Sequence, residues 1–259
     1  LLIMIRVENL TVSKSRKKNQ YILSNLSINF EDPKNVIIGP NGSGKTTLLK
    51  AILGIIKYNG EIKCYFEGKK CNFATNLDLV YRLYNDSVNN ISKLYINMIG
   101  GDYNQFKNII ETFKMTRILD TKIYKLSTGE TKIFGLAMAY SLNADYILID
   151  EPTENLDPSR RELAERLIEQ FVSKRYLLVT HDLKLLKKLR PNRFFIMISG
   201  KIYGGFDPSI FDRLFISREG KGNYIAEIQG GFSKYYLSLD SGDFPLSSFS
   251  SIEEILGGE

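Results

Sequence analysis

A glycine-rich loop between two apolar segments constrains the fold of this 259-residue chain more than any other feature. Residues 39–46 read Gly-Pro-Asn-Gly-Ser-Gly-Lys-Thr and match the pattern GxxxxGK[ST]. The apolar run 35–38 precedes the loop, and the apolar spacing of residues 45–53 predicts a helix after it. A strand, a glycine loop and a helix in this order predict an α/β fold with a parallel sheet.

The chemistry of this loop predicts phosphate binding. Glycines let the backbone curl so that successive N–H groups point at one anion, and the helix N-terminus adds a partial positive charge. We expect Lys45 to reach the β- and γ-phosphates of a nucleotide and the Thr46 hydroxyl to ligate Mg²⁺. The alternative is a fortuitous glycine-rich turn, which the strand-to-helix context disfavours. The predicted phosphate-binding residues are Gly39, Pro40, Asn41, Gly42, Ser43, Gly44, Lys45, Thr46 and Thr47.

An acidic pair follows the apolar segment 145–149, which is typical of a buried parallel strand. A carboxylate at the carboxyl end of such a strand faces the crevice where open α/β sheets bind ligands. Asp150 is therefore a candidate Mg²⁺ ligand, and Glu151 is a candidate to orient or deprotonate an attacking water. Alone, both could equally be solvated loop acids, but the phosphate loop in the same chain favours the catalytic interpretation.

His181 is the only histidine of the chain, and it follows the predicted buried strand 176–180. A neutral imidazole there could donate to a γ-phosphate oxygen or to the attacking water. A lone histidine more often fills a surface or core position. Because this one comes one strand after the acidic pair, we predict a catalytic role for it.

The remaining segments predict how the chain is organised. Residues 4–13 and 21–30 alternate polar and apolar side chains, as two antiparallel strands do, and residues 60–66 and 78–83 are typical of further short strands. Helices are expected at 132–142, 158–171 and 182–189, a polar helical insert at about 86–125, and a hairpin around Gly230 and Gly231. We expect a nucleotide-binding domain at 1–205 and a small appendage at 206–259.

Composition excludes several classes of function. The net charge of +6 permits contact with polyanions, but the basic run Lys14–Lys18 is typical of a solvated loop, so no nucleic-acid partner is expected. Every apolar run is far shorter than the ~18 residues that a membrane span needs. Cys64 and Cys71 have no neighbouring metal ligands and, with no secretory signal expected, predict free thiols in a cytoplasmic protein.

Five segments in one order resemble the ATPase domain of the ATP-binding-cassette (ABC) family, over about residues 4–205. The glycine loop resembles a Walker A motif, and residues 147–153 resemble a Walker B motif. Residues 126–130 (Leu-Ser-Thr-Gly-Glu) resemble the signature segment, residues 155–157 the D-loop, and residues 180–182 the segment of the switch histidine.

This resemblance implies a RecA-like P-loop NTPase sheet with an antiparallel β-subdomain and a short helical subdomain. It also implies that ATP binds between two such domains arranged head to tail, as a homodimer or a heterodimer. Ser127 and Gly129 would then present a hydroxyl, a backbone N–H and a helix N-terminus to the γ-phosphate held by the other subunit. Asp157 would lie at the dimer seam and help to couple the two sites.

The implied activity is Mg²⁺-dependent hydrolysis of ATP, and the implied partner is an integral membrane permease that the ATPase drives from the inner face of the membrane. The helical insert and the region near Tyr84 and Asn85 would dock the permease. A soluble ABC ATPase in cofactor assembly, translation or DNA repair is the alternative. A third possibility is a cassette that binds ATP as a switch without turnover.

The sequence departs from the family pattern at four places. Thr128 stands where the signature usually has glycine, and Glu130 where it usually has glutamine. No glutamine occupies the expected Q-loop, which leaves Asn85 or Tyr84 as a stand-in, with Asn85 as a further candidate Mg²⁺ ligand. Lys14 occupies the place of the aromatic residue that stacks on adenine, with Tyr21 as a possible substitute.

Overall fold

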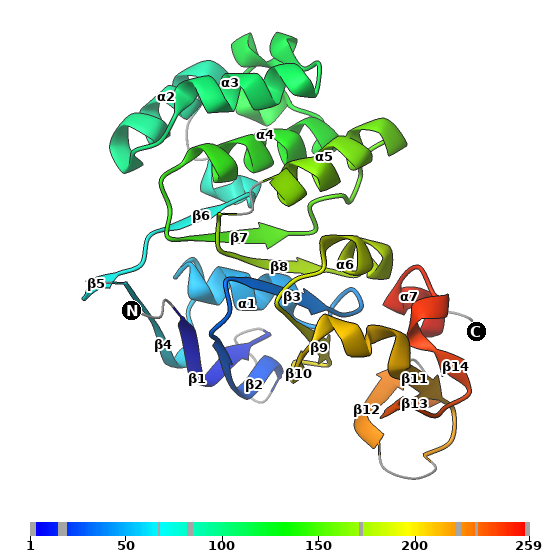
Figure 1. The fold of residues 1–259 in the computed structure, drawn as a ribbon. Helices are drawn as coiled ribbons and strands as arrows, with labels where there is room; N and C mark the ends of the chain where they lie inside the picture. The colour runs from blue at the N-terminus through cyan, green and yellow to red at the C-terminus, as the bar shows by residue number, and fades with distance from the viewer. Residues whose placement is uncertain are drawn as a thin grey trace. The chain divides into compact units, whose positions relative to one another are not determined.

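The computed structural model describes residues 4–14, 20–66, 68–81, 85–170, 173–220, 224–230 and 233–256. The chain forms two compact units (Figure 1). Unit 1 comprises residues 1–70 and 179–259, and unit 2 comprises residues 71–178. None of the described helices is long and apolar enough to span a membrane.

Unit 1 contains a four-stranded antiparallel sheet in the order β2-β1-β4-β5. Its strands are β1 (Ile5–Ser13), β2 (Tyr21–Phe30), β4 (Asn59–Phe66) and β5 (Lys69–Lys70). Buried and exposed side chains alternate along β1, as expected for a strand with one face on a core. The predicted antiparallel pairing of the first two strands is confirmed, while residues 15–18 of the basic run lie outside the described residues.

Both cysteines are disulfide-bonded, so the prediction of free thiols is wrong. In the hairpin of β4 and β5, Tyr65 pairs with Lys70, and Cys64 and Cys71 are the residues that flank this pair in sequence. The prediction relied on composition and on an expected compartment, and neither takes account of strand register.

The second sheet region of unit 1 carries the glycine loop. Strand β3 (Lys34–Ile38) pairs in parallel with β9 (Arg193–Ile198), which pairs in turn with the antiparallel strand β10 (Lys201–Phe206). Helix α1 (Lys45–Ile52) follows the loop, and α6 (Leu183–Leu189) follows His181 and Asp182. The strand, glycine loop and helix occur in the predicted order.

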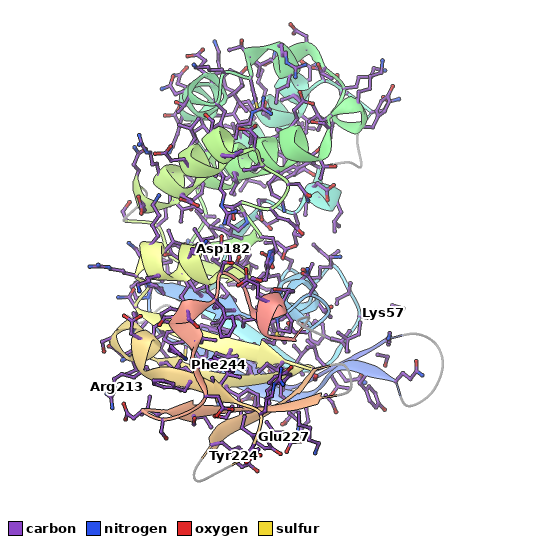
Figure 2. The ribbon with its side chains drawn as sticks, turned by 90° about the vertical axis from the view of Figure 1, so that its right-hand side faces the viewer. Lys57, Asp182, Arg213, Tyr224, Glu227 and Phe244 are labelled. Atoms are coloured by element: carbon purple, nitrogen blue, oxygen red, sulfur yellow. The ribbon has the colours of Figure 1, made fainter. Side chains whose placement is uncertain are left out.

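The C-terminal part of unit 1 is a small sheet in the order β12-β13-β11-β14. Strands β12 (Tyr224–Gly230) and β13 (Ser233–Leu239) form the predicted hairpin, whose turn residue Gly231 lies outside the described residues. The other elements are η4 (Pro208–Arg213), β11 (Leu214–Ser217), β14 (Phe244–Pro245), η5 (Leu246–Ser248) and α7 (Ile252–Leu256). Figure 2 labels Arg213, Tyr224, Glu227 and Phe244 in this part.

Unit 2 contains the strand that carries the acidic pair. Strand β7 (Tyr146–Asp150) pairs in parallel with β6 (Phe73–Thr75), and the chain returns to unit 1 through β8 (Tyr176–Thr180). Helices α4 (Thr128–Ser141) and α5 (Pro158–Gln170) connect these strands along the chain. All residues of β7 before Asp150 are buried, as predicted for a strand of a parallel sheet.

The insert of unit 2 is helical, as predicted. It contains α2 (Val88–Ile99), α3 (Tyr103–Thr112), η2 (Thr116–Asp120) and η3 (Ile123–Lys125). The prediction of a strand at 78–83 is wrong, because Asp78–Val80 forms a short 3₁₀ helix, η1. The hydroxyl of the buried Tyr81 donates to the carbonyl oxygen of Thr75 over 2.8 Å, which turns the chain back on itself.

Candidate functional site

Two glycines of the loop occupy positions where a side chain would clash or strain the backbone. The Gly39 N–H donates to the carbonyl oxygen of Thr180 over 3.1 Å, and a Cβ added at Gly39 would lie 2.2 Å from the carbonyl oxygen of Met197. Gly44 has φ +108°, and a Cβ there would lie 2.7 Å from Leu23 Cδ2. A side chain at either position would displace the loop.

Two polar side chains of the loop are buried. Lys45 is 4% exposed, and its Nζ donates to the carbonyl oxygens of Gly39 at 2.7 Å and Pro40 at 3.1 Å. The Ser43 hydroxyl is buried and has no hydrogen-bond partner among the described residues. A buried polar group without a partner costs about 1–3 kcal/mol, so the loop is suited to a ligand that supplies acceptor oxygens.

The turn formed by residues 180–182, the switch-histidine turn, lies beside the loop. Since Thr180 accepts from Gly39, His181 comes one residue after a direct contact with the start of the loop. The turn is rigid because the Asp182 N–H donates to the Thr180 hydroxyl, while the Asp182 carboxylate caps α6 by accepting from the N–H groups of Lys184 and Leu185. His181 itself is half-buried. Unit 1 thus brings together the two groups that sequence analysis assigned to phosphate.

The acidic pair belongs to unit 2. Asp150 ends β7 and is half-buried, whereas Glu151 is only 6% exposed. Glu151 has φ +43°, a left-handed conformation that costs a residue with a side chain roughly 1–2 kcal/mol. Such strain persists where the surrounding structure holds it, and it is concentrated at functional sites.

Asn76 lies beside the acidic pair, and sequence analysis did not single it out. This residue directly follows β6 and is 3% exposed. Its Nδ2 donates to the Asp150 carbonyl oxygen over 2.9 Å, and its Oδ1 accepts from the Asp150 N–H over 2.7 Å. Lys132 Nζ donates to the same carbonyl oxygen over 3.1 Å. Asn76 therefore fixes the backbone that carries Asp150.

The stand-ins that the sequence suggested for the Q-loop residue are placed differently. Asn85 is exposed in the segment before α2, and Tyr84 lies outside the described residues. Asn76 could have been recognised as a polar residue directly after a buried strand that ends with Ala74 and Thr75. Strand β6 has only three residues, which is too short to be recognised as a strand in the sequence.

Replacing Asn76 by Asp should destabilise unit 2. The variant would keep the acceptor for the Asp150 N–H but would aim a carboxylate oxygen at the Asp150 carbonyl oxygen in a buried place. We expect a loss of about 1–3 kcal/mol in the free energy of unfolding, measured with urea. The matched control is Asn85→Asp, which changes an exposed side chain and should stay within about 0.5 kcal/mol. Equal stability of both variants would contradict the bridging role.

The signature segment begins α4 with a capping box. The Ser127 hydroxyl accepts from the Glu130 N–H, and the Glu130 carboxylate accepts from both the N–H and the hydroxyl of Ser127. Arg117 pairs with Glu130 at 2.5 Å. The hydrogen bond from the Ser127 N–H holds the pKa of Glu130 below its usual value. The serine hydroxyl and the charge of Arg117 lower this pKa further. The departure from glutamine therefore adds a charge that the chain itself neutralises.

The D-loop segment lies against the start of α4. A Cβ added at Gly129 would lie 3.1 Å from the Asn155 carbonyl oxygen, and Asp157 caps α5 by accepting from the Arg160 N–H over 3.0 Å. Ser127, Thr128 and Asp157 are exposed. A pocket of about 170 Å³ in unit 2 lies between these segments and Asp150. It is lined by Asn76, Leu77, Asp78, Thr128, Thr131, Lys132, Asp150, Glu154 and Asn155.

The described residues contain no group of three or more His, Cys, Asp or Glu side chains that could cage a metal ion. Mg²⁺ keeps several water ligands and is usually held by one or two protein side chains together with phosphate oxygens. Thr46 and Asp150 are both half-buried, the first at the start of α1 and the second at the end of β7. Neither side chain is sealed from a ligand.

The residues considered for adenine stacking lie at the first hairpin. Tyr21 is 50% exposed at the start of β2, where it pairs with Ser13, and Lys14 is exposed next to it.

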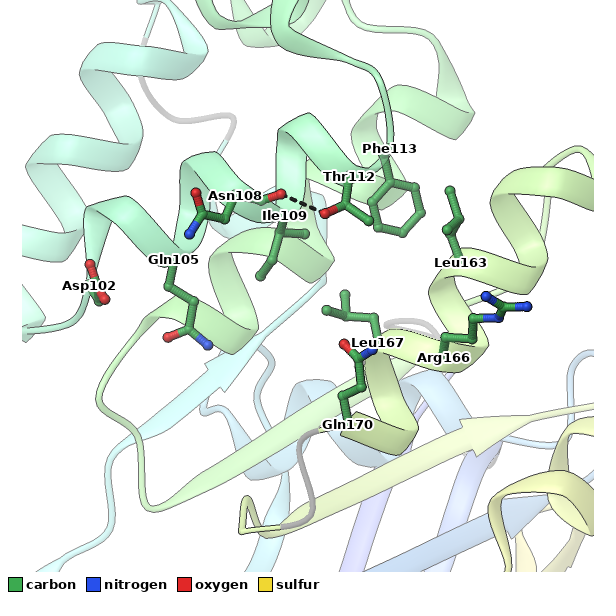
Figure 3. Close-up of a pocket in the computed structure, with 10 residues that line it drawn as sticks. All are labelled: Asp102, Gln105, Asn108, Ile109, Thr112, Phe113, Leu163, Arg166, Leu167 and Gln170. Atoms are coloured by element: carbon green, nitrogen blue, oxygen red, sulfur yellow. Dashed lines mark hydrogen bonds between the residues drawn. The ribbon is translucent and has the colours of Figure 1, made fainter.

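A larger pocket, of about 490 Å³, lies in unit 2 between α3 and α5 (Figure 3). It contains none of the predicted site residues, so it is separate from the candidate site.

Comparison of the chain with protein families gives a match. The family model described as "ABC transporter" matches residues 23–154, which include the glycine loop, the signature segment and the acidic pair.

Curated proteins resemble the chain over most of its length. A tungstate uptake system ATP-binding protein of Peptoclostridium acidaminophilum is 30% identical over 207 residues, which cover 74% of this chain and 96% of that protein. A zinc import ATP-binding protein of Wolbachia pipientis wMel is 29% identical over 214 residues, which cover 77% of this chain and 81% of that protein.

Solved structures confirm the predicted fold class. The structure of a protein named as a cobalt transport ATP-binding protein has a TM-score of 0.82 and 29% identity, and the match covers 98% of this chain and 99% of that chain. A dimeric ATP-binding cassette bound to ADP and phosphate has a TM-score of 0.62 and 22% identity, and the match covers 76% of this chain and 96% of that chain. This likeness concerns the fold alone. The predicted α/β P-loop fold, with parallel and antiparallel sheets, is thus correct.

Proposed function

Because the chain belongs to the ABC transporter family, we propose that it is the subunit that hydrolyses ATP to drive a separate membrane permease. The observation that carries this proposal is the phosphate loop, which leads into the N-terminus of α1 and holds a buried lysine and a buried serine hydroxyl without a hydrogen-bond partner among the described residues. A loop of this kind is suited to the phosphates of a nucleotide.

In this proposal, residues 39–47 bind the phosphates through backbone N–H groups. Lys45 gives up its contacts with the carbonyl oxygens of Gly39 and Pro40 and turns its ammonium to the β- and γ-phosphates. Thr46 and Asp150 would hold Mg²⁺, which neutralises charge on the phosphate oxygens when bound. Asn76 keeps Asp150 in register through its backbone, whereas Asn85, the Q-loop stand-in and candidate Mg²⁺ ligand suggested by the sequence, is exposed in the segment before α2.

Glu151 is the proposed general base. Its carboxylate would accept the proton of the water that attacks the γ-phosphorus. The side chain is buried, so few bulk water molecules would compete for the carboxylate. His181 would donate a hydrogen bond to a γ-phosphate oxygen and stabilise the charge that develops there. The contact between Thr180 and Gly39 ties the histidine turn to the phosphate loop.

The exposed start of α4 supports a shared active site. Ser127 and Gly129 lie at the N-terminus of a 14-residue helix, and Ser127 is exposed. A second subunit, arranged head to tail, would place its γ-phosphate there, where the helix dipole favours an anion. Asp157 would lie at the same seam.

The relatives support an uptake system for an inorganic ion. Their names refer to zinc import, tungstate uptake and cobalt transport. We propose that this chain serves a transporter of that class, attached to the cytoplasmic face of the membrane through its permease.

An apolar stripe on α2 is the proposed docking surface for the permease. The stripe consists of Leu94 and Met98, which lie one turn apart on α2 and have side chains that are 39% and 71% exposed. Large apolar side chains gathered on one exposed helix face mark interaction sites. The stripe lies in the helical insert, where sequence analysis expected the permease.

Replacing Met98 by Glu should detach the subunit from membranes. Burying a methionine side chain is worth about 1.5–3 kcal/mol, so the affinity for the permease should fall roughly tenfold or more. The measurement compares the membrane-bound fraction of tagged variants in the native cell, with Tyr65→Glu as control, because Tyr65 is a similarly exposed residue on β4. The ATPase activity of the isolated Met98→Glu protein should be unchanged.

The same experiment separates the alternatives. If crosslinks from a photoreactive residue at position 98 reach an integral membrane protein, the transport proposal stands. If the wild-type chain is recovered only with ribosomal, DNA-bound or cofactor-assembly proteins, it acts as a soluble ABC ATPase instead.

A further inference from the structure

The C-terminal segment Ser250–Leu256 is an anchored element. Its helix α7 is capped by three nearby contacts: the Glu254 carboxylate accepts from the N–H and hydroxyl of Ser250, and the Glu254 N–H donates to the Ser251 hydroxyl. The hydrogen bond from the Ser250 hydroxyl is the main cause of the lowered pKa of Glu254. Ile252 is 2% exposed and fixes the segment to the core of unit 1.

This segment pairs with the switch-histidine turn. The Leu183 N–H donates to the Ser250 carbonyl oxygen over 3.0 Å, and the Ile252 N–H lies 3.4 Å from the His181 carbonyl oxygen. Between these contacts, Asp182 and Ser251 form an antiparallel bridge. Asp182 is labelled in Figure 2, and α7 is red in Figure 1. The backbone on both sides of the histidine turn is therefore tied to the C-terminal segment.

The next residue of the segment, Glu253, contacts the phosphate loop. Its Oε1 accepts from the Asn41 N–H over 2.6 Å, although the two residues are 212 positions apart in sequence. Its Oε2 is buried and has no hydrogen-bond partner among the described residues. Among the described residues, the capping contacts of α7 are made by Ser250, Ser251 and Glu254 and do not involve Glu253. The orientation of Glu253 toward the loop is therefore not explained by helix capping.

The contact resembles anion binding by the loop. A short hydrogen bond from a backbone N–H to a carboxylate is charge-assisted, as is one to a phosphate oxygen. Asn41 is the third residue of a loop whose N–H groups are suited to phosphate. A carboxylate in this place competes for one N–H group and repels the negative charges of a polyphosphate.

We propose that Glu253 is an internal competitor of the nucleotide, so that the C-terminal segment lowers the affinity of the phosphate loop for ATP until Glu253 leaves Asn41. This inference rests on the proposed function, namely that residues 39–47 bind the phosphates of ATP. Since the same segment pairs with the turn of His181, displacement of Glu253 by ATP also loosens the backbone that carries the switch histidine. The C-terminal segment thereby sets how much ATP the subunit needs before it closes.

The test measures MgATP binding to the full chain by calorimetry. Glu253→Gln keeps an acceptor oxygen and removes the charge, and it should bind MgATP about tenfold more tightly than the wild type, which is ~1.4 kcal/mol. The gain should be smaller for MgADP and absent for adenosine, which has no phosphate. The control is Glu254→Gln, which removes the same charge one residue further along α7 and should change MgATP affinity less than twofold.

Two results would overturn the proposal: wild-type MgATP affinity in Glu253→Gln, or an equal gain for adenosine and ATP. If Glu253→Gln does not fold, hydrogen exchange of the Asn41 amide decides. The amide should be protected in the nucleotide-free wild type, and free exchange would refute the contact. Lys45→Ala separates this inference from its premise, because retained ATP binding in that variant removes the phosphate-loop assignment itself, whatever Glu253 does.

Discussion

The Lys45→Ala variant should lose MgATP binding by a factor of at least about 100. Lys45 is buried inside the phosphate loop, and its ammonium already donates to two carbonyl oxygens there. Hydrogen bonds to charged groups are worth about 1.5–3 kcal/mol each, so losing the lysine's contacts with two phosphates corresponds to roughly two to four orders of magnitude in affinity. Calorimetry with MgATP measures the effect directly.

Lys50→Ala is the matched control for this variant. Lys50 lies in the last turn of the same helix, so its removal changes the net charge of α1 equally but leaves the loop intact. We expect wild-type affinity in the control. Thermal unfolding should accompany both measurements, because Lys45→Ala also leaves the carbonyl oxygens of Gly39 and Pro40 without this donor. Wild-type affinity in a folded Lys45→Ala protein would refute the phosphate-loop assignment.

The phosphate loop could be predicted from the sequence because its physics is local. Glycines, a lysine and a hydroxyl within eight residues determine a curled backbone between a strand and a helix, and no distant partner is needed to recognise it. The acidic pair and the histidine could be assigned for a related reason. Each directly follows a continuous apolar strand, which marks the carboxyl edge of a parallel sheet.

Asn76 could not be found in the same way. Strand β6 has only three residues, and the chain turns into a 3₁₀ helix after it because Tyr81 bonds back to Thr75. The sequence therefore suggested a strand at 78–83 and a Q-loop stand-in at Tyr84 or Asn85. What identifies Asn76 is its pair of hydrogen bonds to Asp150, which is 74 positions away.

Charge effects at the signature were also hidden by local structure. Sequence analysis treated Glu130 only as a departure from glutamine, although Ser127 and Glu130 have the spacing of a capping box. In the structure that carboxylate bonds back to Ser127 and pairs with Arg117.

The contact of Glu253 with Asn41 has no counterpart in any sequence pattern, because it depends on how the C-terminal segment packs in unit 1.

The Glu151→Gln variant should bind ATP, hydrolyse it at least about 100-fold more slowly and accumulate as a dimer. General-base catalysis typically contributes 10²–10⁴-fold, and glutamine cannot accept the proton of the attacking water. The residue has φ +43° and is buried, and glutamine has the same shape, so the substitution preserves the backbone strain and the packing. Because the phosphate contacts remain, ATP holds two subunits together for longer than in the wild type.

Size-exclusion chromatography with light scattering, in MgATP, measures the dimer, and phosphate release measures turnover. Glu169→Gln is the matched control: it changes an exposed carboxylate in the last turn of α5, and it should turn over and elute as the wild type does. Adding Ser127→Arg to Glu151→Gln should abolish the dimer, because a bulky cation at the exposed start of α4 would block the surface that receives the other subunit's phosphate. A Glu151→Gln protein that stays monomeric and hydrolyses ATP at the wild-type rate would show that Glu151 is not the base. A dimer that persists with Ser127→Arg would instead place the subunit contact away from the signature segment. The two outcomes are distinguishable, because Glu151 tests the catalytic base and Ser127 tests the contact between subunits.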